Sequence, residues 1–331
     1  MREIPIIEKM VIFEGGNFLN LDLMENSVHI QYLLSNRQDS RWGLTVTTVG
    51  CQQIAPHESY PPKKHPTRYL FSAEYGRVLE EYQLIYIARG DGQFVSTSYP
   101  STRLTGGGWF ILLFPNEWHN YRPDSETGWV EYWIGFTGTD MQRKIENDFF
   151  EPRQPVFQVG YHEKIVGLYE QAIEVARNQQ AGYQQVLSGI VNLLLGYAYA
   201  EHHNVQFRRI HVTEQLEQAK RLMQENINRN ISCKEIAHRV GMGYSRFRDL
   251  FKQYAGFSPN QYQIELRLQS SKQLLVNTDL SCAEIAYECG FDYVSHFNLL
   301  FKAKTGLTPS QYRRRMSGQG AKSENENGAA E

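Results

Sequence analysis

A stretch of about fifty residues in the C-terminal third of this 331-residue chain occurs twice. The copies begin at Ser232 and Ser281, and each continues as Ser-Cys-x-Glu-Ile-Ala. Later segments also match in order, namely Gly241 and Gly290, Phe-Lys at 251–252 and 301–302, and Gly-x-Ser/Thr-Pro-x-Gln-Tyr at 256–262 and 306–312. The offset is 49 residues up to the glycine and 50 from the phenylalanine onward, which indicates one structural unit present twice with one inserted residue.

Each copy predicts a helix, a tight turn and a second helix. Ser232 with Glu235, and Ser281 with Glu284, have the Ser-x-x-Glu spacing of a capping box, which marks the start of a helix. The shared glycine supplies the backbone freedom that ends this helix. A short turn with glycine between two short helices is typical of the helix-turn-helix motif. A Ser/Thr-Pro-x-Gln segment then predicts a further, closing helix in each copy.

In the second helix of each copy, apolar residues share one arc, so the opposite arc is predicted to be exposed. The apolar positions are Phe247, Leu250 and Phe251, and Phe297, Leu300 and Phe301. Side chains on the exposed arc can reach base edges in a major groove or neighbouring phosphates. The candidate DNA contacts are Ser245, Arg246, Arg248, Asp249 and Lys252 in the first copy, Ser295, His296, Asn298 and Lys302 in the second, and Arg313 in the last closing helix.

The charge distribution supports DNA binding independently of the motif. The whole chain has a formal net charge of −2, but residues 207–316 carry a net charge of +7 and residues 1–206 a net charge of −7. A basic module attached to an acidic one is typical of a domain that binds phosphates.

Residues 28–137 predict an all-β barrel or sandwich. Runs of β-branched and aromatic residues, such as 43–49, 82–87 and 129–136, are separated by turns rich in glycine and proline. All five tryptophans lie before residue 140, and aromatic faces with a few polar groups suit a small flat ligand or a sugar. Most of these rings are expected in the core. The candidate effector contacts are Trp42, Tyr69, Tyr86 and His119.

The repeated pattern resembles the DNA-binding domain of the AraC/XylS family of bacterial transcription regulators, over roughly residues 210 to 316. The order Tyr-Ile-x-x-Gly-x-Gly-x-Phe from Tyr86, Gly-Trp-Phe-Ile from Gly108 and Pro-x-x-x-His-x-Tyr up to Tyr121 is similar to the cupin-type effector domain that this family often carries. The family often has an arginine where this chain has Leu299. The first copy is therefore expected to read more of the DNA sequence than the second.

The resemblance implies an α+β protein with an all-β cupin-like barrel, a helical connector and an all-α tandem helix-turn-helix domain. The expected boundaries are 1–140 for the effector-sensing domain, 141–206 for the connector and dimerisation region, 207–316 for the DNA-binding domain and 317–331 for a disordered tail. The implied function is sequence-specific, effector-responsive regulation of transcription. Activation is the commoner outcome in the family, and repression stays open. The implied partners are duplex DNA, RNA polymerase, a small-molecule effector such as a carbohydrate, and a second copy of the chain.

Two enzymatic alternatives depend on metal ligands that the sequence lacks. A cupin-type metal enzyme fused to a DNA-binding module would need a His-x-His pair before Gly90, where the chain reads Leu-Ile-Tyr-Ile, so His119 is the sole candidate in a motif position. A DNA-alkylation-repair fusion would need a cluster of cysteines, and Cys51 stands alone in the N-terminal half. We therefore expect no enzyme activity, cofactor or metal. The absence of a long apolar run or a leader predicts a cytoplasmic protein without membrane partners.

Overall fold

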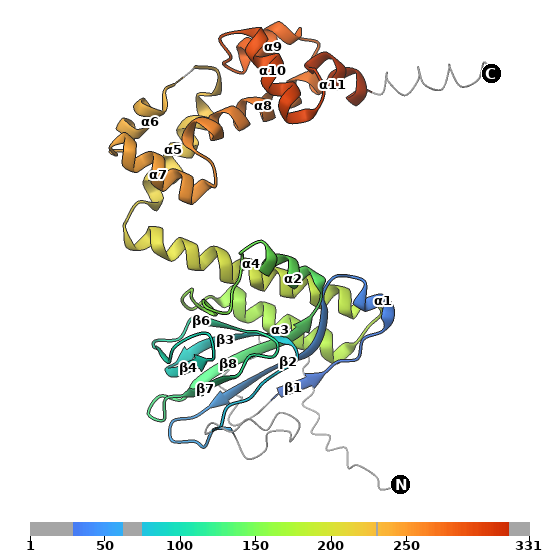
Figure 1. The fold of residues 1–331 in the computed structure, drawn as a ribbon, viewed down its shortest axis with the longest axis vertical. Helices are drawn as coiled ribbons and strands as arrows, with labels where there is room; N and C mark the ends of the chain where they lie inside the picture. Colours follow the sequence, from blue (N-terminus) through green and yellow to red (C-terminus); the bar gives the residue numbers. More distant parts are fainter. Residues whose placement is uncertain (1–28, 62–74, 230, 318–331) are drawn as a thin grey trace, which may run out of the picture. The chain divides into compact units, whose positions relative to one another are not determined.

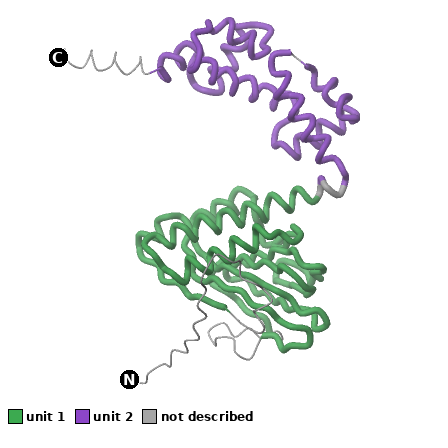
Figure 2. Tube along the Cα trace, turned by 180° about the vertical axis from the view of Figure 1, so that it is seen from behind, with its two compact units in different colours: residues 1–205 green, residues 206–331 purple. Residues whose placement is uncertain are grey.

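The computed structural model describes residues 29–61, 75–229 and 231–317. The chain divides into two compact units, residues 1–205 and residues 206–331 (Figure 2). We call them the N-terminal unit and the C-terminal unit. Tyr69 and the predicted disordered tail, apart from Ser317, lie outside the described residues.

The N-terminal unit contains two antiparallel sheets (Figure 1). The large sheet has the strand order β1-β2-β8-β3-β6-β9, and the small sheet has the order β5-β4-β7. The strands are β1 (His29–Tyr32), β2 (Thr45–Ile54), β3 (Tyr82–Gly90), β4 (Gly92–Ser96), β5 (Thr102–Leu104), β6 (Trp109–Leu113), β7 (His119–Pro123), β8 (Trp129–Thr137) and β9 (Val156–Gln158). This arrangement confirms the predicted sheet-rich, cupin-like N-terminal domain.

The large sheet is covered on both faces, and its central strand β3 shows why the sequence there is apolar throughout. Leu84 and Tyr86 join the core formed with the helices, whereas Ile85 and Ile87 join the core formed with the small sheet. Successive side chains of a strand point to opposite faces, so a strand buried on both sides has no polar alternation. The N-terminal helices are α1 (Arg37–Ser40), α2 (Thr139–Glu146), α3 (Glu163–Asn178) and α4 (Tyr183–Arg209).

Residues 141–205, which make up nearly all of the predicted helical connector at 141–206, are part of the same unit as the sheets. Strand β9 pairs with β6, and α3 and α4 share one core with the large sheet. Tyr169 on α3 donates a hydrogen bond to the carbonyl oxygen of Leu84 on β3 (3.0 Å). The helices therefore complete the N-terminal unit, because the apolar face of the large sheet needs a cover.

The C-terminal unit is entirely helical in its described part and contains the two predicted helix-turn-helix copies. Its helices are α5 (Thr213–Glu225), α6 (Cys233–Arg239), α7 (Tyr244–Ala255), α8 (Pro259–Asn277), α9 (Cys282–Glu288), α10 (Val294–Thr305) and α11 (Pro309–Met316), with a 3-10 turn at Ile227–Arg229. One core gathers around α6 and α7, and a second gathers around α9 and α10, with α8 contributing to both. The repeat in the sequence is thus a repeat of small helical cores.

The two copies use the same turn but cap their first helices differently. Gly241 and Gly290 have φ angles of 70° and 76°, the left-handed conformation that glycine adopts at low cost. The second copy has the full capping box, with the Ser281 amide donating to Glu284 Oε2 at 2.7 Å. In the first copy, the carboxylate of Glu235 instead accepts a hydrogen bond from Arg239 (2.9 Å). The capping box predicted there is therefore only half present, because an arginine one turn later competes for the carboxylate.

Candidate DNA interface and effector site

Helix α7 exposes all the candidate contacts of the first copy. Phe247 and Phe251 are completely buried, and the face away from them is in solvent. On this face the guanidinium of Arg248 donates to its neighbour Asp249 through both Nε and Nη2, each at 3.2 Å. An exposed pair of this kind contributes little to stability, so both groups are available for a partner. The exposed candidates are Ser245, Arg246, Arg248, Asp249 and Lys252.

Helix α10 presents a more apolar face than α7. The candidates Ser295, His296, Asn298 and Lys302 are exposed, as predicted from the helical period. Leu299 lies among them with 70 % of its surface exposed, and Tyr293, the residue that precedes the helix, is 71 % exposed. Tyr293 is an additional candidate, since an exposed phenol at a helix N-terminus can donate to a phosphate. Its place just after the turn of the motif was the available sequence signal.

Arg313 lies in α11, but its guanidinium is used inside the C-terminal unit. Its Nε donates to the carbonyl oxygen of Leu275 (3.0 Å), and its Nη2 donates to that of Leu280. These carbonyls lie in the last turn of α8 and in the segment before α9, so Arg313 holds those segments together. Arg314 and Arg315 are the exposed basic residues of this helix. The long-range contacts of Arg313 could not be read from local spacing.

The three candidate effector residues that the structure describes do not converge on one site. Tyr86 is buried on the helix-facing side of the large sheet, where its hydroxyl donates to the carbonyl oxygen of Gly160 (2.8 Å) and accepts from the His162 amide (3.0 Å). Trp42 follows α1 and is 59 % exposed. Tyr69 lies outside the described residues. His119 is the one described candidate that points into the space between the sheets.

His119 is neutral and held in one tautomer. Burial, assisted by the nearby Arg77 guanidinium, lowers the pKa of His119 to about 4. Its Nδ1 lies 3.1 Å from the carbonyl oxygen of Glu117, and its Nε2 lies 3.3 Å from Nε of Arg77. Because the arginine can only donate, the imidazole proton is on Nδ1 and Nε2 accepts.

His119 belongs to a buried polar cluster between the two sheets. Arg77 also donates to the hydroxyl of Tyr121 (2.8 Å) and to Oε1 of Gln83 (3.1 Å). We define the inter-sheet polar cluster as Gln52, Tyr60, Arg77, Gln83, His119, Tyr121 and Glu131. A polar interior in a sheet domain otherwise lined by apolar residues is expected at a ligand site, where a few polar groups orient the ligand.

Glu131 is the acidic member of the inter-sheet polar cluster. It lies on β8 directly opposite Gln52 on β2, and the Gln52 amide donates to Glu131 Oε1. The hydroxyl of Tyr60 approaches the same oxygen at 3.5 Å. Burial raises the pKa of Glu131 to about 7, against the opposing effects of Gln52, Arg77 and Tyr60. The sequence signal for this cluster was a charged residue at an inward position of an apolar strand.

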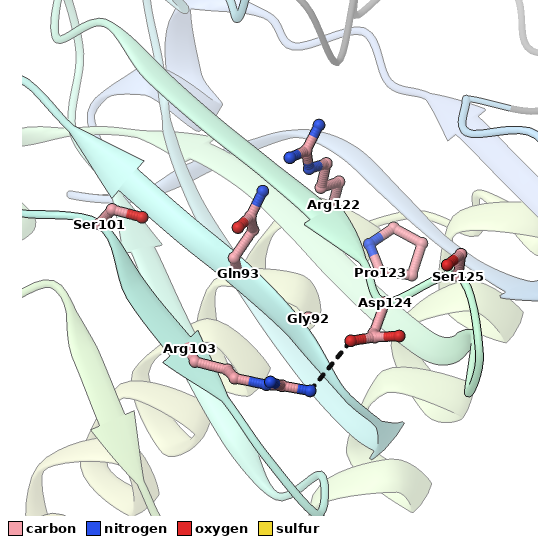
Figure 3. Close-up of a pocket in the computed structure, with 8 residues that line it drawn as sticks. All are labelled: Gly92, Gln93, Ser101, Arg103, Arg122, Pro123, Asp124 and Ser125. Atoms are coloured by element: carbon pink, nitrogen blue, oxygen red, sulfur yellow. Dashed lines mark hydrogen bonds and ion pairs between the residues drawn. The ribbon is translucent and has the colours of Figure 1, made fainter.

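A separate hollow of about 620 Å³ lies on the outer face of the small sheet (Figure 3). Arg103 and Asp124 form an ion pair across it at 3.1 Å. Phe94 and Tyr121, the neighbours of its lining residues Gln93 and Arg122, belong to the core between the sheets, so the hollow faces outward. The small sheet therefore separates this hollow from the inter-sheet polar cluster. The lining residues are Gly92, Gln93, Ser101, Arg103, Arg122, Pro123, Asp124 and Ser125.

Within residues 29–61, 75–229 and 231–317, no group of three or more histidine, cysteine, aspartate or glutamate side chains is placed to hold a metal ion. In the same part of the chain, no helix has the length and apolar character needed to cross a bilayer.

A basic unit with two exposed helix-turn-helix faces, joined to a sheet domain with a polar interior, defines a DNA-binding regulator that carries its own ligand-binding domain. Two family profiles match the chain, one described as a helix-turn-helix domain over residues 236–315 and one as an AraC-like ligand binding domain over residues 59–195. The chain belongs to the AraC family of transcription regulators.

Similar proteins include operon regulators of comparable length. The raffinose operon transcriptional regulatory protein of Pediococcus pentosaceus is 28% identical over 240 residues, which are 72% of this chain and 86% of that protein. The Msm operon regulatory protein of Streptococcus mutans is 23% identical over 246 residues, covering 72% and 85% of the two chains. A solved AraC-type DNA-binding regulator from Chromobacterium violaceum is 34% identical, covers 33% of this chain and 96% of that one, and has a TM-score of 0.31.

Proposed function

We propose that this protein activates transcription by binding an operator through α7 and α10, and that a carbohydrate bound between the two sheets controls this activity. The observation that carries the proposal is the combination, in one chain, of two exposed polar recognition faces and a buried polar cluster that no catalytic arrangement explains. An effector can act on DNA binding only through a difference in its affinity for two arrangements of the chain.

The polar character of the two recognition helices supports direct reading of bases. Arg248 is suited to guanine, because a guanidinium can donate two parallel hydrogen bonds to its O6 and N7. Asn298 is suited to adenine, and Leu299 to the methyl group of thymine. Two helix-turn-helix motifs in one chain suit two major-groove segments roughly 34 Å apart, which is one turn of DNA.

A carbohydrate effector is supported by the chemistry of the inter-sheet polar cluster and by the name of one relative. The cluster combines hydrogen-bonding side chains with the aromatic rings of Tyr121, Trp129 and Trp133 in the same core. Sugars present hydroxyl groups at their edges and C–H groups on their faces, which match these two kinds of surface. The relative from Pediococcus pentosaceus is named for the raffinose operon.

A homodimer is supported by an uncharged stripe on α4. Val186 and Leu193 are each 49 % exposed, although they sit on a helix that is otherwise packed against the sheet domain. Gly189, Gly196 and Ala200 continue this exposed stripe at helical spacing. A second copy presenting the same stripe would bury it in a two-fold symmetric contact. Activation of transcription also requires RNA polymerase as a partner. Because the proposed target is DNA, we propose that the protein acts in the cytoplasm.

The function is tested by selecting bound duplexes from a random pool with the full-length protein and then footprinting the selected site. The expected result is an enriched sequence in which each bound protomer protects two major-groove segments one helical turn apart. A reporter gene placed downstream of that site should then respond to the sugar that shifts the melting temperature of the protein. A pool without enrichment, together with salt-insensitive binding, would contradict the proposal. Stoichiometric iron, zinc or manganese in the purified protein would instead favour the metal-enzyme alternative.

A further inference from the structure

Three buried polar atoms in the space between the sheets have no hydrogen-bond partner among the described residues. They are the side-chain oxygen of Gln52, the indole nitrogen of Trp129 and Oε2 of Glu131. Each of these side chains is at most 4 % exposed. Burial of a polar group without a partner costs stability, and native proteins seldom leave several in one place. Three such atoms together therefore point to a bound group that meets them.

The strand register places the three side chains on one face of the large sheet. Gln52 lies opposite Glu131, and Ile54 lies opposite Trp129. Residues two apart along a strand share a face, and Ile54 and Trp129 belong to the core under the small sheet. Tyr60 connects the set, because its hydroxyl is 3.5 Å from Glu131 Oε1 and its ring packs edge-on against Trp129 with 5.9 Å between ring centroids.

The three atoms differ in what they need, and this restricts the chemistry of the bound group. The oxygens of Gln52 and ionised Glu131 accept hydrogen bonds, whereas the indole N–H of Trp129 only donates. A hydroxyl group both donates and accepts. A carboxylate on the ligand would leave the two oxygens without donors and face Glu131 with like charge, and an ammonium group would leave the indole without an acceptor.

We propose that Gln52, Trp129 and Glu131 form a subsite for neighbouring hydroxyl groups of an uncharged polyol, and that binding of these hydroxyls releases the proton of Glu131. The proposal rests on the proposed function, in which the effector occupies the space between the sheets, and adds the residues, the ligand groups and the dependence on pH.

The proton release follows from the surroundings of Glu131. Burial raises the pKa of this carboxyl to about 7, so it is largely protonated at lower pH. Hydroxyl groups that donate to the carboxylate stabilise its ionised form and lower its pKa. Affinity therefore rises with pH until Glu131 is ionised in the free protein as well. The polar and titratable groups that face Glu131 are Gln52 from β2, Tyr60 after β2, Arg77 before β3 and Tyr121 from β7.

The other titratable groups of the cluster do not titrate in this range. Burial raises the pKa of Tyr121 to about 12 and that of Tyr60 well above its ordinary value. His119 stays neutral, because burial lowers its pKa to about 4. A proton released near pH 6.5 can therefore be assigned to Glu131 among these groups.

The test is calorimetric titration of the full-length protein with D-xylose, D-galactose, melibiose and raffinose in turn. Each titration is made near pH 6.5 in two buffers of different ionisation enthalpy, which reveals proton release. At least one sugar is expected to bind with release of a fraction of a proton, and more tightly at about pH 7.5 than at about pH 5.5. Glu131→Gln should weaken binding roughly tenfold and abolish the release. Trp129→Phe keeps an aromatic ring, removes the N–H, and should weaken binding several-fold.

The control is Glu80→Gln, which removes an exposed carboxylate just before β3. This variant should change neither the affinity for the sugar nor the number of protons released on binding. If no sugar binds, or if one binds without proton release, the polyol subsite is overturned. If a sugar binds and both Glu131→Gln and Trp129→Phe retain wild-type affinity, the subsite is wrong, although the protein is still a sugar-responsive regulator. Urea unfolding of each variant shows whether its N-terminal unit is folded, and binding to the selected operator keeps failure of the subsite separate from failure of the proposed function.

Discussion

At the scale of single residues, the two recognition helices expose different side chains at matching positions. Arg248 and Asp249 on α7 correspond to Asn298 and Leu299 on α10. Arg248 on α7 and Leu299 on α10 are both exposed, but only the arginine can form two directed hydrogen bonds to a base. The neighbouring Asp249 accepts a hydrogen bond from this guanidinium on the exposed face of the helix. The first copy should therefore supply more of the sequence preference.

We predict that Arg248→Ala lowers the affinity for the selected operator by about 1–3 kcal/mol and relaxes the preference at one base pair. Leu299→Ala should cost less, because a thymine methyl contact is only apolar. Repeating the selection with each variant measures both effects. A loss of preference with Leu299→Ala alone, while Arg248→Ala behaves as wild type, would reverse this ranking of the two copies.

Glu131 makes the stability of the N-terminal unit depend on pH. The folded chain holds the proton up to a pKa of about 7, whereas an unfolded glutamate loses it near 4.5. Between these values the folded state binds more protons, so stability falls as pH rises. The loss attributable to Glu131 is at most about 3 kcal/mol from about pH 5 to about pH 8. Urea unfolding should show a smaller loss in Glu131→Gln than in wild type, with Glu80→Gln behaving as wild type.

Arg313 and Arg314 are neighbours with different expected roles. Arg313 donates to two backbone carbonyls, and removing such charged hydrogen bonds costs about 1.5–3 kcal/mol each. We expect Arg313→Ala to lower the melting temperature clearly. Arg314→Ala should leave the melting temperature unchanged and weaken DNA binding uniformly across sequences, as loss of a phosphate contact does. Equal melting temperatures for the two variants would contradict this assignment.

At the scale of elements, the sequence predicted the features that are determined by residues close together in the chain. The paired glycines, the proline-started helices α8 and α11 and the buried arcs of α7 and α10 follow from spacing alone. The cap of α6 differs from the predicted capping box because Arg239 competes for the carboxylate of Glu235. Strand β9 was not predicted, because a strand of three residues gives no periodic pattern in the sequence. The inter-sheet polar cluster and the true position of Tyr86 depended on strand register, which pairs residues far apart in the chain.

The uncharged stripe of α4 gives an element-scale prediction. Leu193→Asp places a charge in the proposed dimer contact and should convert dimers to monomers, since burial of an unpaired carboxylate opposes association. Sedimentation velocity over a range of protein concentrations measures this. Gln171→Asp, on an exposed face of α3, is the matched control and should leave the dimer intact. A Leu193→Asp protein that remains dimeric would move the interface elsewhere.

At the scale of the whole molecule, the two units have opposite net charges, and only the C-terminal unit has the positive charge that favours DNA binding. The stretch 207–316 carries +7 and the stretch 1–206 carries −7, so phosphate contacts belong to the C-terminal unit. Each neutralised phosphate releases counterions, and the logarithm of the binding constant falls with the logarithm of salt concentration by about 0.9 per contact. The slope therefore counts phosphate contacts for whatever assembly binds the DNA.

The number of phosphate contacts obtained from the salt slope distinguishes one DNA-bound protomer from two. If the full chain binds a two-fold symmetric operator as a dimer, its salt slope should be about twice that of residues 206–331 alone on a single half-site. Leu193→Asp should reduce the salt slope of the full chain to that of residues 206–331, because each monomer then binds DNA with only its own phosphate contacts. Fluorescence anisotropy with labelled duplexes between about 50 and about 200 mM salt measures all three slopes. Equal slopes for the full chain and the isolated unit would show that one protomer suffices, and a flat dependence would refute phosphate binding by this face altogether.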